Sequence, residues 1–208
     1  MISINKGPQP NSLLKAIKDG ETIYLDLKKD VMVDLRKMLL YEQGCVCCYC
    51  QKRIPEKINP KSKIEHFKSR ENFPELQLEF RNMFIACNGK GINSVETCDT
   101  FKKSKELNSF NFLNNNIEEK IKYAKNGVIF SIDEDINNEI NEVLNLNEEG
   151  LRQAREYVYK SIKRIKQKLN EKGQFQRGIK KLTSKYSSKT AQQQFESFYG
   201  VKLYYINK

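Results

Sequence analysis

Cysteine is the residue type whose placement most clearly indicates chemistry in this 208-residue chain. All six cysteines lie between residues 45 and 98, and Cys47 and Cys50 have the spacing of two thiolates that hold one tetrahedral Zn²⁺ from a tight turn. Cys87 and Cys98 can supply the other two ligands. Cys45 and Cys48 offer a competing first pair with the same spacing. The sequence therefore predicts a structural zinc site and leaves its first pair open.

The only histidine, His66, lies between these cysteines and directly follows Glu65. An imidazole with a pKa of about 6.5 is largely neutral at pH 7 and can act as a general base. The carboxylates of Glu65 and Asp99 are hard oxygen ligands that suit Mg²⁺ or Mn²⁺. A base beside a divalent cation is typical of a site that hydrolyses phosphodiester bonds.

The order Cys-x-x-Cys, Glu-His, Asn, Cys, Cys-Asp-x-x-Lys resembles that of an HNH endonuclease, whose fold is the ββα-metal module. More narrowly, residues 47–54, 64–68, 81–82 and 97–103 are similar to the PtuB family. PtuB-like proteins are the HNH effectors of Septu and of some retron-associated anti-phage systems. The likeness is strongest over residues 45–105 and continues more loosely to about residue 170.

This resemblance implies a role for each matching residue. His66 is the expected base, Glu65 and Asp99 are the expected ligands of a catalytic Mg²⁺ or Mn²⁺, and Asn82 is expected to orient the loop that carries the base. Many family members have Asp where this chain has Glu65. The resemblance also implies an ATPase partner of the PtuA type and, in retron settings, a reverse transcriptase with its RNA–DNA product.

Positive charge is concentrated in the last quarter of the chain. Residues 151–208 carry 15 Lys and Arg against 3 Asp and Glu, whereas residues 1–150 carry 22 against 23. A basic segment of this kind is typical of a protein that contacts a polyanion, although a lysine-rich tail can also be only a solvated face. The candidate nucleic-acid contacts are Lys68, Lys102, Lys103, Arg152, Arg155 and Lys163.

Hydrophobic periodicity predicts a mostly helical scaffold around these residues. Helices are expected over about residues 12–17, 31–44, 71–80, 134–144, 148–171, 174–186 and 190–199. Residues 64–67 predict a short strand. Asn126 and Gly127 predict a hairpin over residues 123–130, because an Asn-Gly pair supplies the positive φ angles of a tight turn.

The expected fold class is α+β, mainly α, with a zinc-stabilised ββα-metal module embedded in a helical scaffold. Residues 1–44 are expected to form an N-terminal helical segment and residues 45–105 the nuclease module. Residues 106–208 are expected to form an acidic connector with the hairpin, followed by a basic helical region. No run of about 18 apolar residues is present, and the first residues lack the layout of a secretory signal, so we expect a cytoplasmic protein without a membrane span.

The expected function is that of a metal-dependent endonuclease in anti-phage defence, with DNA favoured over RNA as its substrate. The alternative is a catalytically inactive, zinc-stabilised nucleic-acid-binding or adaptor subunit.

Overall fold

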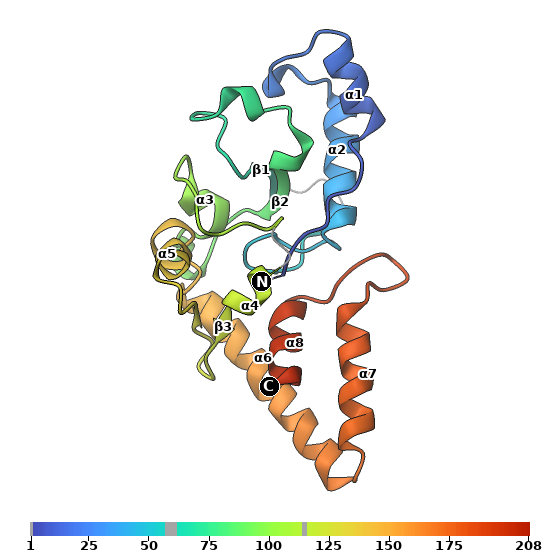
Figure 1. The fold of residues 1–208 in the computed structure, drawn as a ribbon, viewed down its shortest axis with the longest axis vertical. Coiled ribbons are helices and arrows are strands. Elements are labelled where there is room, and N and C mark those ends of the chain that lie inside the picture. Colours follow the sequence, from blue (N-terminus) through green and yellow to red (C-terminus); the bar gives the residue numbers. More distant parts are fainter. Residues whose placement is uncertain (1, 57–61, 114–115) are drawn as a thin grey trace.

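The computed structural model describes residues 2–56, 62–113 and 116–208. It has a mixed α+β fold that is about 49% helical and contains two small two-stranded sheets. Figure 1 shows an elongated molecule, with the N-terminal helices and the first sheet in one half and the C-terminal helices in the other. The predicted class, α+β with helices predominating, is confirmed.

The N-terminal segment folds into helices α1 (Asn11–Lys18) and α2 (Lys29–Glu42), as the periodicity predicts. Their apolar stripes face the core, where Leu13, Leu35 and Leu39 are fully buried. Helix α2 ends at Glu42, and Gly44, two residues later, has a φ of +60°, a left-handed conformation that glycine adopts easily. The chain then enters the turn that contains the first cysteines.

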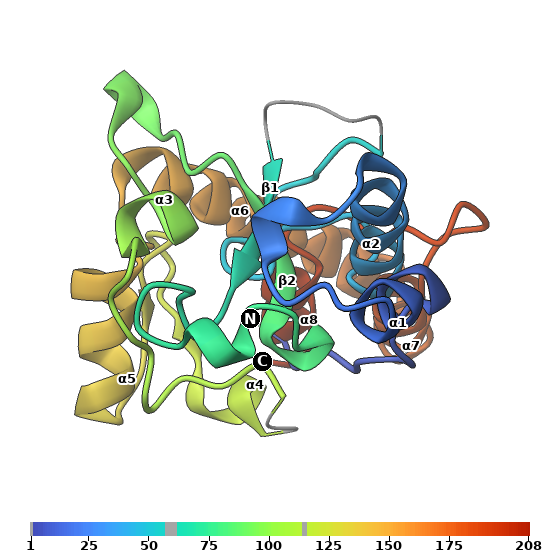
Figure 2. The ribbon, with the colours of Figure 1, turned by 90° about the horizontal axis from the view of Figure 1, so that it is seen from above.

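The first sheet pairs strand β1 (Ser62–His66) with strand β2 (Met83–Cys87) in an antiparallel register. His66 lies opposite Met83 and Glu65 opposite Phe84, and every residue of β2 is buried. The short helix α3 (Cys98–Lys102) follows and packs against β2. Figures 1 and 2 both place this sheet between α1 and α2 on one side and α3 and α5 (Glu134–Asn138) on the other.

The segment between β1 and β2 differs from the predicted helix over residues 71–80. It forms two single 3₁₀ turns, Pro74–Leu76 and Phe80–Asn82. Further 3₁₀ turns lie at Tyr24–Asp26 and Ile92–Ser94. Phe73 has a φ of −134° and a ψ of 65°, outside the helical region that a following proline disfavours, so a helix begun at residue 71 cannot continue into Pro74.

The second sheet is the predicted hairpin. It follows helix α4 (Ile117–Lys120) and pairs β3 (Lys122–Tyr123) with β4 (Ile129–Phe130). Only Gly127 has a positive φ, +80°, so the expectation of two such residues was wrong for Asn126. The Ala124 N–H donates to the Val128 carbonyl and the Gly127 N–H to the Ala124 carbonyl, which makes a three-residue loop with glycine at its left-handed position.

The C-terminal half consists of α6 (Glu149–Glu171), α7 (Phe175–Ser187) and α8 (Tyr199–Asn207), preceded by α5 and a π-helical turn, Glu139–Val143. Helix α8 packs against both α6 and α7. The predicted helix over residues 190–199 was wrong. That segment is an irregular loop with two turns that returns to the first cysteine turn, where the N–H of Phe195 donates to the Gly44 carbonyl.

One continuous hydrophobic core runs through both halves, from Leu13 in α1 to Ile206 in α8. Among the helices of the described residues, none is long and apolar enough to cross a membrane. The N-terminal and C-terminal segments therefore share one hydrophobic core.

Candidate metal centre and adjoining carboxylate site

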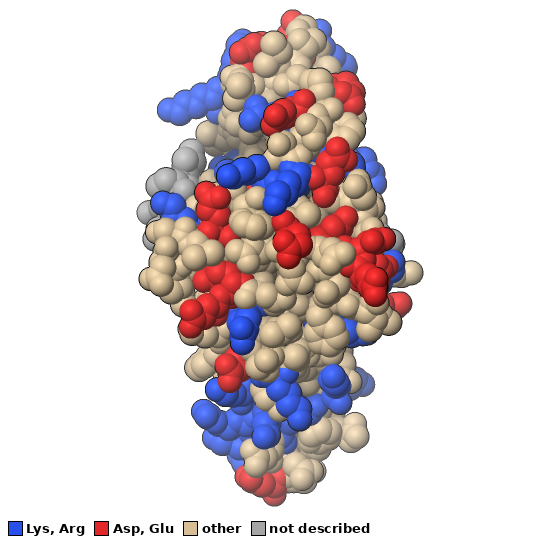
Figure 3. Space-filling model, turned by 90° about the vertical axis from the view of Figure 1, so that its left-hand side faces the viewer, with Lys and Arg blue, Asp and Glu red and all other residues tan. Residues whose placement is uncertain are grey.

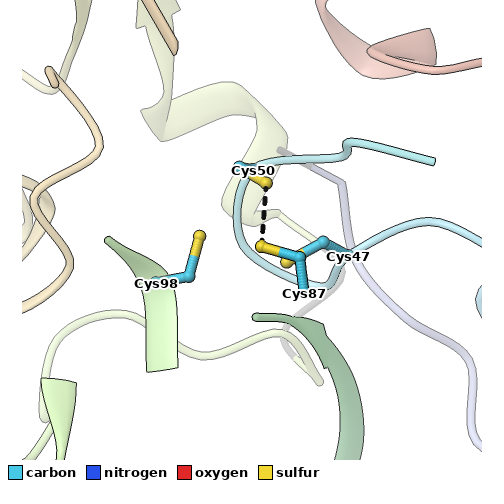
Figure 4. A group of neighbouring side chains, drawn as sticks. All are labelled: Cys47, Cys50, Cys87 and Cys98. Carbon is cyan, nitrogen blue, oxygen red and sulfur yellow. Dashed lines mark hydrogen bonds between the residues drawn. The ribbon is translucent and has the colours of Figure 1, made fainter. Parts of the chain in front are cut away.

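Four cysteines from three elements converge in the core. The Sγ atoms of Cys47, Cys50, Cys87 and Cys98 all lie within 4.8 Å of one another, and all four side chains are buried. Figure 4 shows the side chains meeting from the turn after α2, the end of β2 and the start of α3. The pair that the sequence left open is Cys47 and Cys50, because Cys45 and Cys48 lie outside this group.

Hydrogen bonds to β2 position the first two cysteines. The side chain of Gln43 bridges the cysteine turn and β2: its amide donates to the carbonyls of Val46 and Ile85 and accepts from the Ile85 N–H. The Cys48 N–H also donates to the Ile85 carbonyl, at 3.1 Å. The cysteine turn is therefore held against β2, the strand that ends at Cys87.

The four thiols form a set that suits a metal. The Sγ atoms of Cys50 and Cys87 are 3.7 Å apart, and all six cysteines are free. Burial opposes ionisation of Cys47, but the surrounding thiols hydrogen-bond to its sulfur and hold its pKa well below the usual value; the same bonds raise the pKa of Cys50 and Cys98. Several thiolates cannot coexist in this space without a cation, so the cluster could hold an ion such as zinc.

The carboxylate of Glu65 lies beside this cluster and is almost fully buried. Its Oε1 accepts a hydrogen bond from the Tyr49 hydroxyl at 2.7 Å and lies 2.9 Å from the Nζ of Lys102. Burial and then the adjacent Asp99 carboxylate raise the pKa of Glu65 well above its usual value, while Lys102 lowers it. Asp99 itself pairs with Lys63, at 2.5 Å.

His66 follows Glu65 at the end of β1. Its Nε2 lies 3.0 Å from the Gln77 carbonyl oxygen, and its ring packs edge-on against Tyr24, with the centroids 4.6 Å apart. Burial lowers the pKa of His66 to about 4, against a smaller raising effect of the Gln77 hydrogen bond. The imidazole is therefore neutral at pH 7. Since Nε2 faces an acceptor, it carries the proton, and Nδ1 is left unprotonated, with no hydrogen-bond partner among the residues that the structure describes.

Asn82 closes the loop that separates His66 from β2. Its Oδ1 accepts from the Lys68 N–H at 2.7 Å, and its Nδ2 donates to the carbonyls of Lys68 and Leu76. The Asn82 carbonyl also accepts from the Phe67 N–H. In the described structure this amide is fully occupied in orienting the loop after His66.

The three lysines predicted to contact a phosphate near this site differ in their surroundings. Lys102 is completely buried, where it pairs with Glu65 and donates to the His66 carbonyl at 3.3 Å. Lys68 bridges to Glu106 and Asn108. Lys103 is 71% exposed. In this conformation Lys103 is accessible to a phosphate and Lys102 is not.

The three cations of α6 also separate into two classes. Arg155 is buried, and its guanidinium donates to the carbonyls of Gly127 and Leu146 at 2.6 and 2.8 Å. Its expected contact with nucleic acid conflicts with this position, because its donors hold the hairpin and the start of α6 together. Arg152 and Lys163 are exposed. Figure 3 shows Lys and Arg gathered over the end of the molecule built by α6 and α7.

Two residues that adjoin the carboxylates were not predicted from the sequence, namely Lys63 and Tyr49. Lys63 is two residues before Glu65 on β1, and side chains at this spacing share a face of a strand, which is a signal that could have found it. Tyr49 lies inside the cysteine turn, so its orientation depends on how that turn packs. No model of a protein family matches the chain, and no curated protein matches it significantly.

Proposed function

We propose that this protein is a metal-dependent nuclease of the HNH type, which hydrolyses phosphodiester bonds of nucleic acid. The observation that carries the proposal is that Glu65 and His66 end strand β1, while Asp99 on α3 lies close enough to act on the pKa of both. A protein that only binds nucleic acid has no need for this set of side chains.

The four-cysteine cluster is proposed to hold a structural Zn²⁺. Its sulfurs come from the turn after α2, from β2 and from α3, so one ion would join the three elements that carry the candidate site. A closed set of four thiolates leaves no open coordination position, and this zinc would not take part in the chemistry.

Glu65 and Asp99 are proposed to bind a second ion, Mg²⁺ or Mn²⁺. Burial and then the adjacent Asp99 carboxylate raise the pKa of Glu65; a bound divalent cation would offset both effects, and carboxylate oxygens are its preferred ligands. Such an ion, when bound, stabilises negative charge on a phosphate and on the leaving oxygen.

His66 is proposed as the general base. The Gln77 carbonyl holds Nε2–H, which leaves Nδ1 to take the proton from an attacking water. Asn82 acts on this step by orientation, since its amide holds the backbone that follows His66. The exposed cations Lys103, Arg152 and Lys163 are proposed to attract the nucleic-acid backbone.

The biological role that we propose is that of an anti-phage effector in the cytoplasm. It would work with an ATPase partner of the PtuA type and, in a retron setting, with a reverse transcriptase and its product. These proposals rest on the resemblance of residues 45–105 to the PtuB family.

A second candidate function is a catalytically inactive, zinc-stabilised nucleic-acid-binding or adaptor subunit. It is favoured by the ion pairs of both carboxylates, because Lys102 and Lys63 already neutralise Glu65 and Asp99. In the nuclease, the divalent ion has to compete with or supplement these ammonium groups.

Cleavage assays separate the two functions. The protein, alone and with its copurifying partner and ATP, is incubated with plasmid DNA and with tRNA in the presence of Mg²⁺ or Mn²⁺. We expect divalent-dependent cleavage that His66→Ala abolishes while the zinc content stays at the wild-type level. A complex that binds either substrate and cleaves neither would establish the adaptor instead.

A further inference from the structure

A cavity of about 580 Å³ opens between the hairpin, α6, the start of α7 and α8. None of the cysteines, Glu65, His66 or Asp99 lines it. Its volume falls within the range of about 300–1,000 Å³ that is common for small-molecule sites. The cavity is therefore a candidate ligand site separate from the one described above.

Aromatic rings make up much of its wall. The rings come from the hairpin and all three C-terminal helices: Tyr123, Phe130, Tyr159, Phe175 and Tyr205. Tyr205 packs against Tyr159 with the centroids 5.0 Å apart and against Tyr123 at 6.4 Å, so three of the rings form a continuous surface. Such a surface favours a planar ring that can stack on it.

The charged residues that line the cavity are all lysines: Lys125, Lys163, Lys166 and Lys208. Lys166 donates to the carbonyls of Tyr205 and Ile206 at the end of α8, so it is already engaged. Lys125 and Lys163 are exposed, and among the described residues neither is paired with a carboxylate. The charge of the rim thus selects for an anion.

Two amides complete the lining. Gln167 and Asn170 lie four and seven residues after Lys163 on α6, which places all three on one face of the helix. Side-chain amides both donate and accept hydrogen bonds, the combination that matches the edge of a nucleobase. The cavity therefore combines ring faces, amides and free ammonium groups.

We propose that this cavity binds a nucleoside phosphate, with the base stacked on the aromatic wall and the phosphate at Lys125 and Lys163. Two sources offer this chemistry, a free mononucleotide and the 5′-phosphorylated end of a single strand. The site does not depend on the nuclease proposal, because it requires no cleavage and shares no catalytic residue with it.

Calorimetric titration of the full chain without added Mg²⁺ or Mn²⁺ tests the proposal. The probes are AMP, 5′-phosphorylated and unphosphorylated oligothymidylate, adenosine and inorganic phosphate at one ionic strength. We expect AMP, the phosphorylated strand or both to bind at least about fivefold more tightly than adenosine and phosphate. Saturation by AMP alone identifies a free nucleotide as the source, and preference for the phosphorylated over the unphosphorylated strand identifies a strand end.

Two variants and a matched control locate the binding. Phe175→Leu removes a ring while keeping an apolar side chain, and Lys163→Glu reverses one rim charge. Each is expected to weaken binding about fivefold or more, whereas Lys168→Glu, an exposed change on the same helix outside the cavity, is expected to weaken it less than twofold. Equal effects of the two charge reversals, unchanged binding in Phe175→Leu with its circular dichroism intact, or phosphate binding as tight as that of AMP would each overturn the proposal.

Discussion

Lys102 on α3 and Glu65 on β1 form a buried ion pair. The Nζ of Lys102 lies 2.9 Å from Oε1 of Glu65, and the two side chains are 0% and 3% exposed. The ammonium also donates to the carbonyl of His66. Lys102 therefore positions both the carboxylate and the backbone of the candidate base, a role different from the phosphate contact expected from the sequence.

Removing this ammonium leaves Glu65 without its buried partner. We expect Lys102→Met to lower the free energy of unfolding by about 3–5 kcal/mol at pH 8, as measured by urea denaturation. The matched control is Lys103→Met, a neighbouring exposed position, which should change it by less than about 0.5 kcal/mol. Similar losses in both variants would contradict the positioning role of Lys102.

The loss in Lys102→Met should also depend on pH. Burial and Asp99 raise the folded-state pKa of Glu65, and the variant lacks the cation that opposes them. A carboxyl whose pKa is higher in the folded than in the unfolded state loses stability as pH rises, because the folded form must give up a proton it holds more tightly. The difference from the wild type should therefore be smaller at pH 5 than at pH 8.

The zinc proposal makes a clear distinction among the cysteines. Cys98→Ser should reduce the zinc content from about one ion per chain to near zero and lower the unfolding midpoint, because a four-thiolate shell loses one ligand. Cys45→Ser is the control, since Cys45 is buried but lies outside the cluster. Elemental analysis of both purified variants is the measurement, and zinc loss in Cys45→Ser would reopen the choice of the first pair.

Asn82 is expected to contribute to both stability and activity. In Asn82→Ala the backbone N–H and carbonyl of Lys68 lose their partner, at a cost of about 1–3 kcal/mol. Cleavage should fall because the loop after His66 loosens, while zinc is retained. The exposed amide of Asn72, which donates to the Ser104 carbonyl, gives the control Asn72→Ala, with a cost below about 1 kcal/mol. Full activity in Asn82→Ala would remove Asn82 from the site.

Glu139 stabilises the chain after α3. Its carboxylate accepts hydrogen bonds from the N–H groups of Asn108, Ser109 and Phe110, at 2.6 to 2.9 Å. Glu139→Gln replaces one of the two acceptor oxygens with an NH₂ group, which cannot accept from these N–H groups. We therefore expect the free energy of unfolding to fall by about 1–3 kcal/mol, as measured by thermal or urea unfolding. Glu142→Gln, an exposed change three residues later, should be nearly neutral. Equal losses would show that charge alone accounts for the effect.

Arg152 and Arg155 test the division of cations on α6. Arg155→Ala should cost about 3 kcal/mol or more, since it removes the donors to two buried carbonyls, whereas Arg152→Ala should stay within about 0.5 kcal/mol. Binding to a fluorescent oligonucleotide should show the reverse pattern in the folded proteins: Arg152→Ala weakens it and reduces its salt dependence. A stable Arg155→Ala that binds poorly would restore Arg155 as a nucleic-acid contact.

The parts of the fold that were predictable are those in which local pattern and packing agree. Helix α6 has an apolar stripe with charged residues around it, and the sequence predicted its range to within a few residues. Helix α8 was missed because its residues are apolar or aromatic on several sides, so no stripe reveals it. The pattern of the preceding segment predicts a helix, but backbone hydrogen bonds of Phe195 and Phe198 to Gly44 and Gln51 hold it as an irregular loop.

Within the candidate site, the sequence could point to the four clustered cysteines but could not predict the environment of the residues around them. The choice between Cys47 and Cys45 depends on which sulfurs face β2, and the sequence spacing is the same for both pairs. Likewise, Lys102 and Lys103 are adjacent cations in the sequence, yet one end of α3 buries the first and exposes the second. Tertiary packing decides both cases.

The contacts between the C-terminal segment and the cysteine turn have a consequence for folding during synthesis. The Gln51 carbonyl accepts from the Phe198 N–H, the Gln51 side chain accepts from the Gly200 N–H, and the Ser197 hydroxyl accepts from the Arg53 N–H. Gln51 and Gly200 are separated by 149 positions, so during synthesis all four cysteines leave the ribosome long before the residues that brace their turn. The four thiols of a nascent chain can therefore come together early, but the hydrogen bonds that stabilise their turn form only after α8 has been synthesised.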